Sequence, residues 1–311
     1  IKADLICVTQ TRYLKRLFLF LYKIQLIDTA EGSMFVPEFY KKINWRLNTK
    51  DENQLNMHNS KISFNNLLSK KYGLKNGIVI AGGPSLKRFN EVDFQNFGLV
   101  ISVNDFVIAN LDFFKKSCLD IVCFSDSTLF FGASEFTKNF YIKLQEAFNI
   151  RPFYIVVDIK SYEIVRLNGD FSNYLIGIER KPLKNFKLIS NTDLITSTNP
   201  SANILTSFAM IIGLTIVDQI SLFGVDGLEE NNEKIMNNKN KSSHRSSAYE
   251  NYNASLPGFY RTYESAVLTH NYYNINLKKI IEFAEYNNKN VYTLFESNYE
   301  CLANSLLTSN R

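Results

Sequence analysis

Short apolar runs alternate with helix-like stretches along the chain from residue 77 onward. The runs span three to five residues, and most are apolar throughout, which is typical of strands buried on both faces of a parallel sheet. Helical spacing of apolar residues is strongest over Ala202–Gly213 and Ile275–Asn287. The alternation predicts an α/β fold, a mostly parallel sheet flanked by helices. The predicted strands are Gly77–Ala81, Leu99–Val103, Ile121–Phe124, Phe153–Val157, Ile220–Phe223 and Val291–Thr293.

The chain before residue 77 has a different pattern. Over residues 12–27, apolar side chains recur at helical spacing among Lys and Arg, which predicts an amphipathic helix. Such a helix either packs on the core or docks on an anionic membrane surface. Residues 48–66 are rich in Asn, Lys and Ser and predict a linker. We therefore expect an N-terminal helical segment and linker over residues 1–60 and one Rossmann-like domain over residues 61–311.

The most polar long segment covers residues 229–258 and follows the predicted strand Ile220–Phe223. A loop of this length inside a compact domain is usually a lid, a binding loop or disorder. Ligands of α/β proteins bind beyond the carboxyl ends of strands. We interpret the segment as a lid over about residues 229–262, with simple disorder as the alternative.

Charge and composition narrow the classes of function. The chain has 35 Lys and Arg against 30 Asp and Glu, a dispersed net charge of +5, which does not predict a nucleic-acid partner. The apolar run Leu17–Tyr22 is far shorter than the roughly 20 residues of a membrane-spanning helix. We expect a cytoplasmic protein, with peripheral association at the inner face of the membrane if residues 12–27 dock there. The four cysteines lack metal-ligand or redox spacing, so we expect reduced thiols.

Polar residues follow several predicted strands and indicate a ligand-binding crevice. The first strand opens into a Gly-Gly-Pro-Ser turn, whose backbone N–H groups can approach a phosphate. The carboxyl ends of the strands meet at one edge of a parallel sheet. A turn or capping role is the alternative for each residue taken alone. The candidate nucleotide-binding residues are Gly82, Gly83, Pro84, Ser85, Asn104, Asp126, Ser201 and Asp226.

The search for a general base is short because the chain has only three histidines. His58 lies in the predicted linker, His244 in the predicted lid, and His270 just ahead of the last predicted helix. We expect His270 to accept a proton near neutral pH, with a structural role as the alternative. No Asp-x-Asp motif follows a predicted nucleotide-binding strand, so we expect no required metal and no cofactor. The candidate phosphate donors of the lid are Tyr249, Tyr252, Tyr260 and Tyr263.

Taken in order, these features resemble the bacterial sialyltransferases of glycosyltransferase family 42, which use CMP-sialic acid to decorate lipooligosaccharide, and the related MptE-like proteins. The resemblance covers about residues 76–306 and is distributed rather than dense. The matching features are the turn Ile80–Lys87, Asn104, Asp126 ahead of Leu129–Phe131, Ser201 at a helix start, Gly224–Asp226, His270, Val291–Leu294 and Leu302–Asn304.

The resemblance implies a GT-A-like variant of the Rossmann fold and a single displacement at the anomeric carbon. His270 would deprotonate the acceptor hydroxyl, while Asn104, the turn amides and lid tyrosines stabilise the departing phosphate without a metal. The donor would be a CMP-linked sugar acid, such as a sialic acid relative or Kdo. The acceptor would be a glycan or lipid-linked glycan of the bacterial surface.

The chain departs from the family pattern at several positions. The family's Asn in the glycine turn is Gly82, its Asn near the ribose is Asp126, and its Tyr after Gly-Ile-Asp is Leu228. The family's Arg before Ser201 has no counterpart. These changes affect sugar specificity more than nucleotide binding. Two other functions stay open: an MptE-like Mg²⁺-dependent pyrophosphokinase using Asp126 and Asp226 as metal ligands, and a noncatalytic scaffold of glycan assembly.

Overall fold

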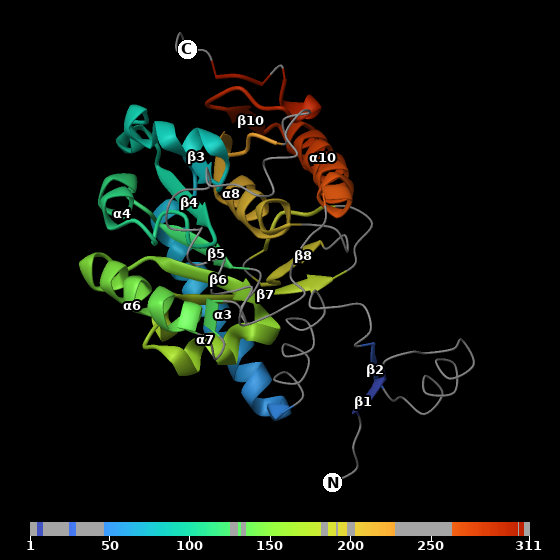
Figure 1. Ribbon diagram of the computed structural model, residues 1–311. Coiled ribbons are helices and arrows are strands. Elements are labelled where there is room, and N and C mark those ends of the chain that lie inside the picture. The colour runs from blue at the N-terminus through green and yellow to red at the C-terminus, as the bar shows by residue number, and fades with distance from the viewer. Residues whose placement is uncertain are drawn as a thin grey trace.

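The computed structural model of the chain is described over residues 5–8, 25–28, 47–124, 130–131, 135–181, 186–190, 192–197, 203–227, 263–303 and 305–307. Its centre is an eight-stranded sheet in which every paired neighbour is parallel (Figure 1). The predicted α/β fold is therefore confirmed. In spatial order the strands are β10 (Asn290–Thr293), β9 (Val217–Phe223), β3 (Leu74–Ile80), β4 (Leu99–Val103), β5 (Ile121–Phe124), β6 (Tyr154–Asp158), β7 (Leu175–Lys181) and β8 (Ile195–Ser197).

Helices cover both faces of the sheet, with α4 and α6 on one side and α8 and α10 on the other (Figure 1). Each face has its own cluster of buried apolar side chains. The first face carries α3 (Lys50–Lys71), the π-helix η6 (Leu205–Ala209) continuing into α8 (Met210–Ile216), and α10 (Tyr263–Tyr286). The second carries η2 (Pro84–Glu91), η3 (Phe94–Asn96), α4 (Leu111–Ser117), α6 (Glu135–Ile150) and α7 (Tyr162–Asn168). Short 3₁₀ turns η4 (Ile159–Ser161), η5 (Ser172–Tyr174) and η8 (Glu300–Leu302) complete the elements.

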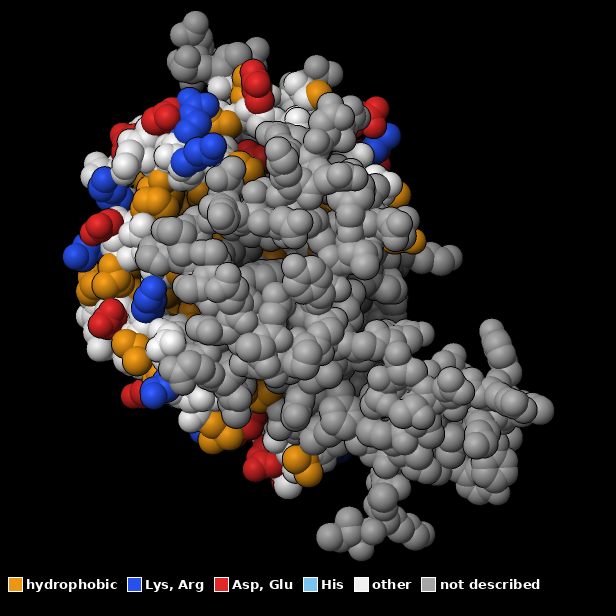
Figure 2. All heavy atoms as spheres, viewed as in Figure 1, with side chains coloured by type: hydrophobic (Ala, Val, Ile, Leu, Met, Phe, Trp, Pro, Cys, Tyr) orange, Lys and Arg blue, Asp and Glu red, His pale blue; other side chains and the backbone are white. Residues whose placement is uncertain are grey.

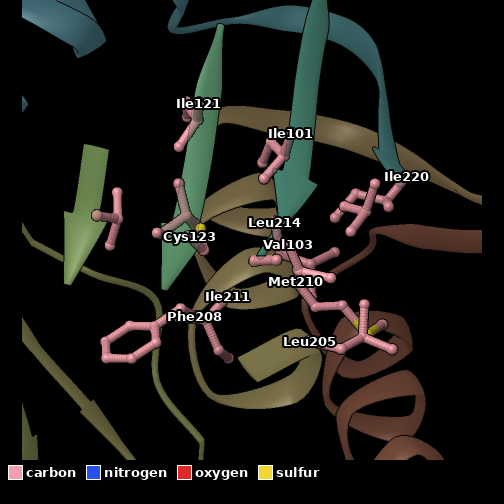
Figure 3. Close-up of a cluster of buried hydrophobic side chains, with 14 of the residues drawn as sticks. Ile101, Val103, Ile121, Cys123, Leu205, Phe208, Met210, Ile211, Leu214 and Ile220 are labelled. Atoms are coloured by element: carbon pink, nitrogen blue, oxygen red, sulfur yellow. The ribbon is translucent and has the colours of Figure 1, made fainter. Parts of the chain in front are cut away.

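The helix formed by η6 and α8 is buried along its whole length. Figure 3 shows Phe208 and Ile211 of this helix in one cluster with Ile101 of β4 and Cys123 of β5, and all four side chains are at most 1% exposed. Each fully buried side chain of this size stabilises the fold by about 1.5–3 kcal/mol. A helix that is apolar all round belongs in a core, so the predicted helix here is confirmed.

Helix α3 occupies the region where a linker was expected, so that prediction is wrong. Its start is fixed by a capping box, in which the Thr49 hydroxyl accepts from the Glu52 N–H and the Glu52 carboxylate accepts from the Thr49 N–H. The helix buries only a narrow stripe that includes Phe64. Ser60 also accepts a 2.9 Å bond from the Gly177 N–H of β7. The domain boundary expected at residue 60 falls inside this helix.

The outcome differs for three further expectations. A parallel pair forms between β1 (Leu5–Val8) and β2 (Gln25–Asp28), so the helix expected over residues 12–27 is wrong at its carboxyl end, and the rest of it lies outside the described residues. The expected lid over 229–262 also lies outside them. Helix α10 begins at Tyr263, well before the expected start at Ile275.

The order of the strands creates one topological switch point. From β3 the chain builds the sheet outward to β8 and then returns, placing β9 and β10 on the other side of β3. The helix after β3 packs on one face of the sheet and the helix after β9 packs on the other. In open α/β sheets, ligands bind beyond the carboxyl ends of the strands at such a point. The loops after β3 and β9 are therefore the expected position of a ligand-binding site.

The described residues show a mixed surface charge and no membrane-spanning helix. Lys and Arg side chains are interspersed with Asp and Glu on the described portion of the face in Figure 2, which matches the dispersed charge of the sequence. Over the described residues, no helix combines the length and apolar character needed to cross a membrane.

Candidate functional site

The loops after β3 and β9 contact each other directly at the switch point. The Gly83 N–H donates a 2.8 Å hydrogen bond to the Gly224 carbonyl. The Ser85 N–H, in the first turn of η2, donates a 2.9 Å bond to the Asp226 carboxylate. A carboxylate at the start of a helix is favoured by the helix dipole. Asp226, which follows β9, therefore fixes the position of the Gly-Gly-Pro-Ser turn, which follows β3.

The two glycines of the turn are required by packing. A Cβ on Gly82 would lie 1.8 Å from the ring of Phe106, and a Cβ on Gly83 would lie 2.1 Å from an Asp226 carboxylate oxygen. We expected the amides of both residues to face a phosphate, but the Gly83 N–H is used by Gly224. Within the described residues, the Gly82 N–H makes no hydrogen bond. Of the two amides expected to bind a phosphate, only the Gly82 N–H is therefore available to a ligand.

The segment after β10 contacts the loops after β3 and β9, and these three segments together form the rim of the candidate site. The Ser297 hydroxyl donates a 2.7 Å bond to the Val225 carbonyl, and the Asn298 N–H donates a 2.7 Å bond to the Asp226 carbonyl. On the other side, the Arg88 guanidinium lies 3.9 Å from the centre of the Phe295 ring, close enough for a cation–π contact. The strand ends of β3, β9 and β10 are thus held together at one edge.

Two polar side chains at this edge lack a hydrogen-bonding partner in the described structure. Oγ of Ser85 and Oδ1 of Asn104 are both buried from solvent and neither is bonded. Asn104 has a left-handed backbone, with φ of 56°, a conformation that Asn tolerates better than most residues. A buried polar atom without a partner costs free energy, about 1–3 kcal/mol. Such atoms at a topological switch point are positioned to bind a polar ligand.

Asn104 lies beside the glycine turn because of the register of the sheet. Ile80 of β3 pairs with Ser102 of β4, so the chain leaves the two strands at neighbouring positions. The Asn104 N–H donates to the Cys123 carbonyl at 2.8 Å, which fixes the backbone of the β4 loop against β5. The side chain is half-buried and its carboxamide is free to bind a ligand.

The opening of the buried helix is polar and well ordered from Asn203 onward. The Asn203 side chain accepts bonds from the Thr206 N–H and hydroxyl, at 2.9 and 3.1 Å. The Thr196 hydroxyl of β8 donates a 2.8 Å bond to the Ser207 carbonyl. The first turn of this helix is π-helical, a conformation found frequently at functional sites. Ser201 itself lies outside the described residues.

The structure also identifies residues that the sequence analysis missed. Phe106 covers Gly82, and Asn203 caps the helix. Tyr299 is 9% exposed, and burial raises the pKa of its phenol, with Asp226 contributing a smaller effect of the same sign. Tyr299 is therefore a neutral phenol near Asp226. The Asn-x-x-Thr pattern before an apolar helix is a capping signal that could have identified Asn203.

The thiols of Cys123 and Cys301 are poor nucleophiles. Burial raises the pKa of the Cys123 thiol far above its ordinary value, and it raises the pKa of Cys301 to about 11. Both are therefore protonated at neutral pH, and the thiolate is the reactive form. Cys118, Cys123 and Cys301 are free cysteines. This is the state expected of structural thiols.

The remaining predicted site residues cannot be placed against this rim. Asp126, Tyr249, Tyr252 and Tyr260 lie outside the described residues. Tyr263 and His270 both belong to helix α10, and their side chains are outside the description. His270 was expected just ahead of the last helix and instead lies within it, because α10 starts earlier than its apolar pattern suggests.

The described residues contain no group of three or more His, Cys, Asp or Glu side chains that could hold a metal ion. The prediction that no metal is required stays a prediction. Neither the comparison with protein-family models nor the search of curated proteins gave a match to this chain.

Proposed function

We propose that this protein is a glycosyltransferase that uses a CMP-linked sugar acid and transfers the sugar to a bacterial surface glycan, on a GT-A-like variant of the Rossmann fold. The observation that supports ligand binding is the pair of buried, unpartnered polar atoms on Ser85 and Asn104 beside the switch point. Nucleotides bind at this edge in many folds of this architecture. The choice of CMP and of the sugar acid comes from the family resemblance.

Within this proposal, some residues at the rim contact the phosphate and others position the residues that do. The Nδ2–H groups of Asn104, the Ser85 hydroxyl and the Gly82 N–H donate to the phosphate of the nucleotide, and the unpartnered Oδ1 of Asn104, which can only accept, is left for a hydroxyl of the ribose. Asp226 does not touch the phosphate, because two anions repel; it fixes the turn through the Ser85 N–H. Asp126, Ser201 and the lid tyrosines are assigned to the nucleotide and phosphate by resemblance alone.

The proposed reaction is a single displacement. The oxygen of the acceptor hydroxyl forms a bond to the anomeric carbon as the bond between that carbon and the phosphate oxygen breaks. CMP leaves with the electron pair, and His270 takes the proton of the acceptor. Hydrogen bonds to the phosphate stabilise its developing charge, so the step needs no divalent metal.

A turnover assay tests the proposal directly. The protein is incubated with CMP-linked sialic acid or CMP-Kdo in EDTA, with and without a lipooligosaccharide acceptor, and released CMP is measured by chromatography. We expect release in EDTA that increases with acceptor. Release of AMP from ATP that requires Mg²⁺ would favour the pyrophosphokinase, and no turnover of either donor would favour the scaffold.

Replacing Asn104 by Gly should weaken CMP binding at least tenfold without destabilising the protein. The side chain makes no bond within the described protein, and Gly adopts its left-handed backbone without strain. The free energy of unfolding should not fall, because the substitution removes a buried oxygen that has no partner. Asn288→Gly is the matched control, since Asn288 has the same φ of 56° but is exposed in the turn before β10. Equal CMP affinity in both variants would contradict the proposed site.

A further inference from the structure

The loop after β9 is held in place by hydrogen bonds from two other segments. This loop, Gly224–Gly227, begins and ends with glycines in the left-handed region, with φ of 75° and 77°. Glycine leaves the backbone freer than any other residue, so the conformation of the loop depends on its contacts. The Gly224 carbonyl accepts a 2.8 Å bond from the Gly83 N–H of the turn after β3. The next two carbonyls, of Val225 and Asp226, accept from the segment after β10.

One of the groups that donate to these carbonyls is a side chain, the Ser297 hydroxyl. It lies 2.7 Å from the Val225 carbonyl oxygen, whereas the other two carbonyls accept from backbone N–H groups. The same hydroxyl accepts a 3.2 Å bond from the Tyr299 N–H, and the two bonds together fix its orientation. Tyr299 is 9% exposed and belongs to the buried cluster on the first face of the sheet. Ser297 therefore joins the loop after β9 to a residue anchored in the core.

The position of this loop determines where the Asp226 carboxylate lies. The Asp226 carbonyl accepts a 2.7 Å bond from the N–H of Asn298, the residue after Ser297, and the carboxylate accepts a 2.9 Å bond from the Ser85 N–H. Without the hydroxyl of Ser297, the Val225 carbonyl loses its donor and the loop can shift. Hydrogen bonds weaken steeply as their distance and angle depart from the optimum. A small shift would therefore weaken the bond that fixes the Gly-Gly-Pro-Ser turn.

A second serine shows that a hydroxyl bound to a carbonyl is not by itself a positioning group. The Ser305 hydroxyl donates a 2.8 Å bond to the Leu302 carbonyl, three residues earlier. That bond closes a local turn beside η8. The bond from Ser297 instead joins segments that are 72 residues apart in the chain, and one of them carries Asp226. Ser305 is therefore a matched control for Ser297.

We propose that Ser297 is a positioning residue of the candidate site. It fixes the loop after β9, so that Asp226 holds the Gly-Gly-Pro-Ser turn in the form that binds a ligand. The segment after β10 is then a part of the site and more than a cover for the sheet. This inference rests on the proposed function for the identity of the ligand, but the hydrogen bonds that it invokes exist in the ligand-free protein.

The test measures amide hydrogen exchange of single residues by NMR in the ligand-free wild type, Ser297→Ala, Ser297→Thr and Ser305→Ala. In Ser297→Ala, the Gly83 and Ser85 amides should exchange about 2- to 10-fold faster than in the wild type, the range for loss of one hydrogen bond. Ser297→Thr keeps the hydroxyl and should restore slow exchange. Ser305→Ala should leave both amides unchanged. Exchange of the β4 amides reports global unfolding and corrects for any general loss of stability.

A calorimetric titration with CMP in EDTA shows whether the change in the turn affects binding. Ser297→Ala should weaken CMP binding by about 3- to 10-fold, because the Ser85 hydroxyl and the Gly82 N–H are no longer held in one arrangement. Ser297→Thr and Ser305→Ala should bind CMP like the wild type.

The outcomes separate the inference from the proposed function. Unchanged exchange at Gly83 and Ser85 in Ser297→Ala, or an equal increase in Ser305→Ala, overturns the inference whatever the protein binds. Faster exchange with an unchanged CMP affinity also overturns it, since the turn would then be loosened without effect on the site. If the wild type does not bind CMP, the proposed function fails and the exchange rates alone decide the inference. If Ser297→Ala does not fold, Ser297→Cys, whose thiol is a weak donor, takes its place.

Discussion

Gly224→Ala is expected to destabilise the protein by about 2–4 kcal/mol and to abolish nucleotide binding. Gly224 has φ of 75°, where an L-residue pays about 1–2 kcal/mol. A Cβ there would also lie 2.2 Å from the Ala81 carbonyl oxygen. That oxygen belongs to the backbone and cannot rotate away, so the loop after β9 must move. Urea unfolding measures the stability change.

The matched control for Gly224→Ala is Gly73→Ala. Gly73 has a similar φ of 80°, but an added Cβ would meet nothing within 4 Å. It should cost only the backbone strain, about 1–2 kcal/mol, and leave binding intact. The larger loss in Gly224→Ala arises because Gly224 accepts from Gly83, so its displacement also disturbs the contact between Asp226 and Ser85. Equal destabilisation by the two substitutions would show that the loops after β3 and β9 are not tightly joined.

His270→Ala is expected to reduce sugar transfer by about 100- to 10,000-fold, the range for loss of a general base. The Kd for CMP should change less than twofold, because the proposed base acts on the acceptor and not on the nucleotide. Initial rates of CMP release with saturating acceptor measure the first effect, and calorimetry measures the second.

His58→Ala is the control for His270→Ala, since His58 is exposed on helix α3 and should have no effect on either quantity. If His270→Ala retains transfer within a few-fold of wild type, His270 is not the base. If it loses CMP binding as well, the residue acts in binding or in the packing of α10.

The sequence was most informative where strands are buried on both faces. Strands such as β5 are entirely buried and appear as unbroken apolar runs. Strand β7 was missed because its apolar start at Leu175 runs into the charged residues Glu179, Arg180 and Lys181 at its half-buried end. Strand β8 was missed because its three residues, Ile195–Ser197, are too short for a periodic signal.

Helix α3 shows a different limit of sequence patterns. Of its buried positions, Asn56, Ser60 and Ser63 are polar, so its buried stripe does not appear apolar. Polar residues can be buried there because they find partners: the Ser60 hydroxyl, for example, donates to the Asn56 carbonyl and accepts from β7. Tertiary contacts of this kind are invisible in a single sequence. The capping box at Thr49 was the one local signal available.

The candidate site was predictable in outline and not in its contacts. The polar ends of β3, β4 and β9 indicated a crevice, and the switch point brings the loops after β3 and β9 together. The sequence could not show that Asp226 binds the Ser85 N–H, 141 residues away. It also could not show that Phe106 covers Gly82. Both contacts depend on strand order, which the apolar runs do not specify.

The central claim is that this edge of the sheet binds a cytidine nucleotide without a metal, and a thermal-shift measurement with CMP in EDTA tests it most directly. CMP at about 100 times its Kd should stabilise the folded state by about 2.7 kcal/mol, which raises the melting temperature of a chain of this length by roughly 4 °C. UMP, GDP and ATP should raise it less, and Mg²⁺ should add nothing. A melting temperature unchanged by CMP, or raised only by ATP with Mg²⁺, would contradict the claim.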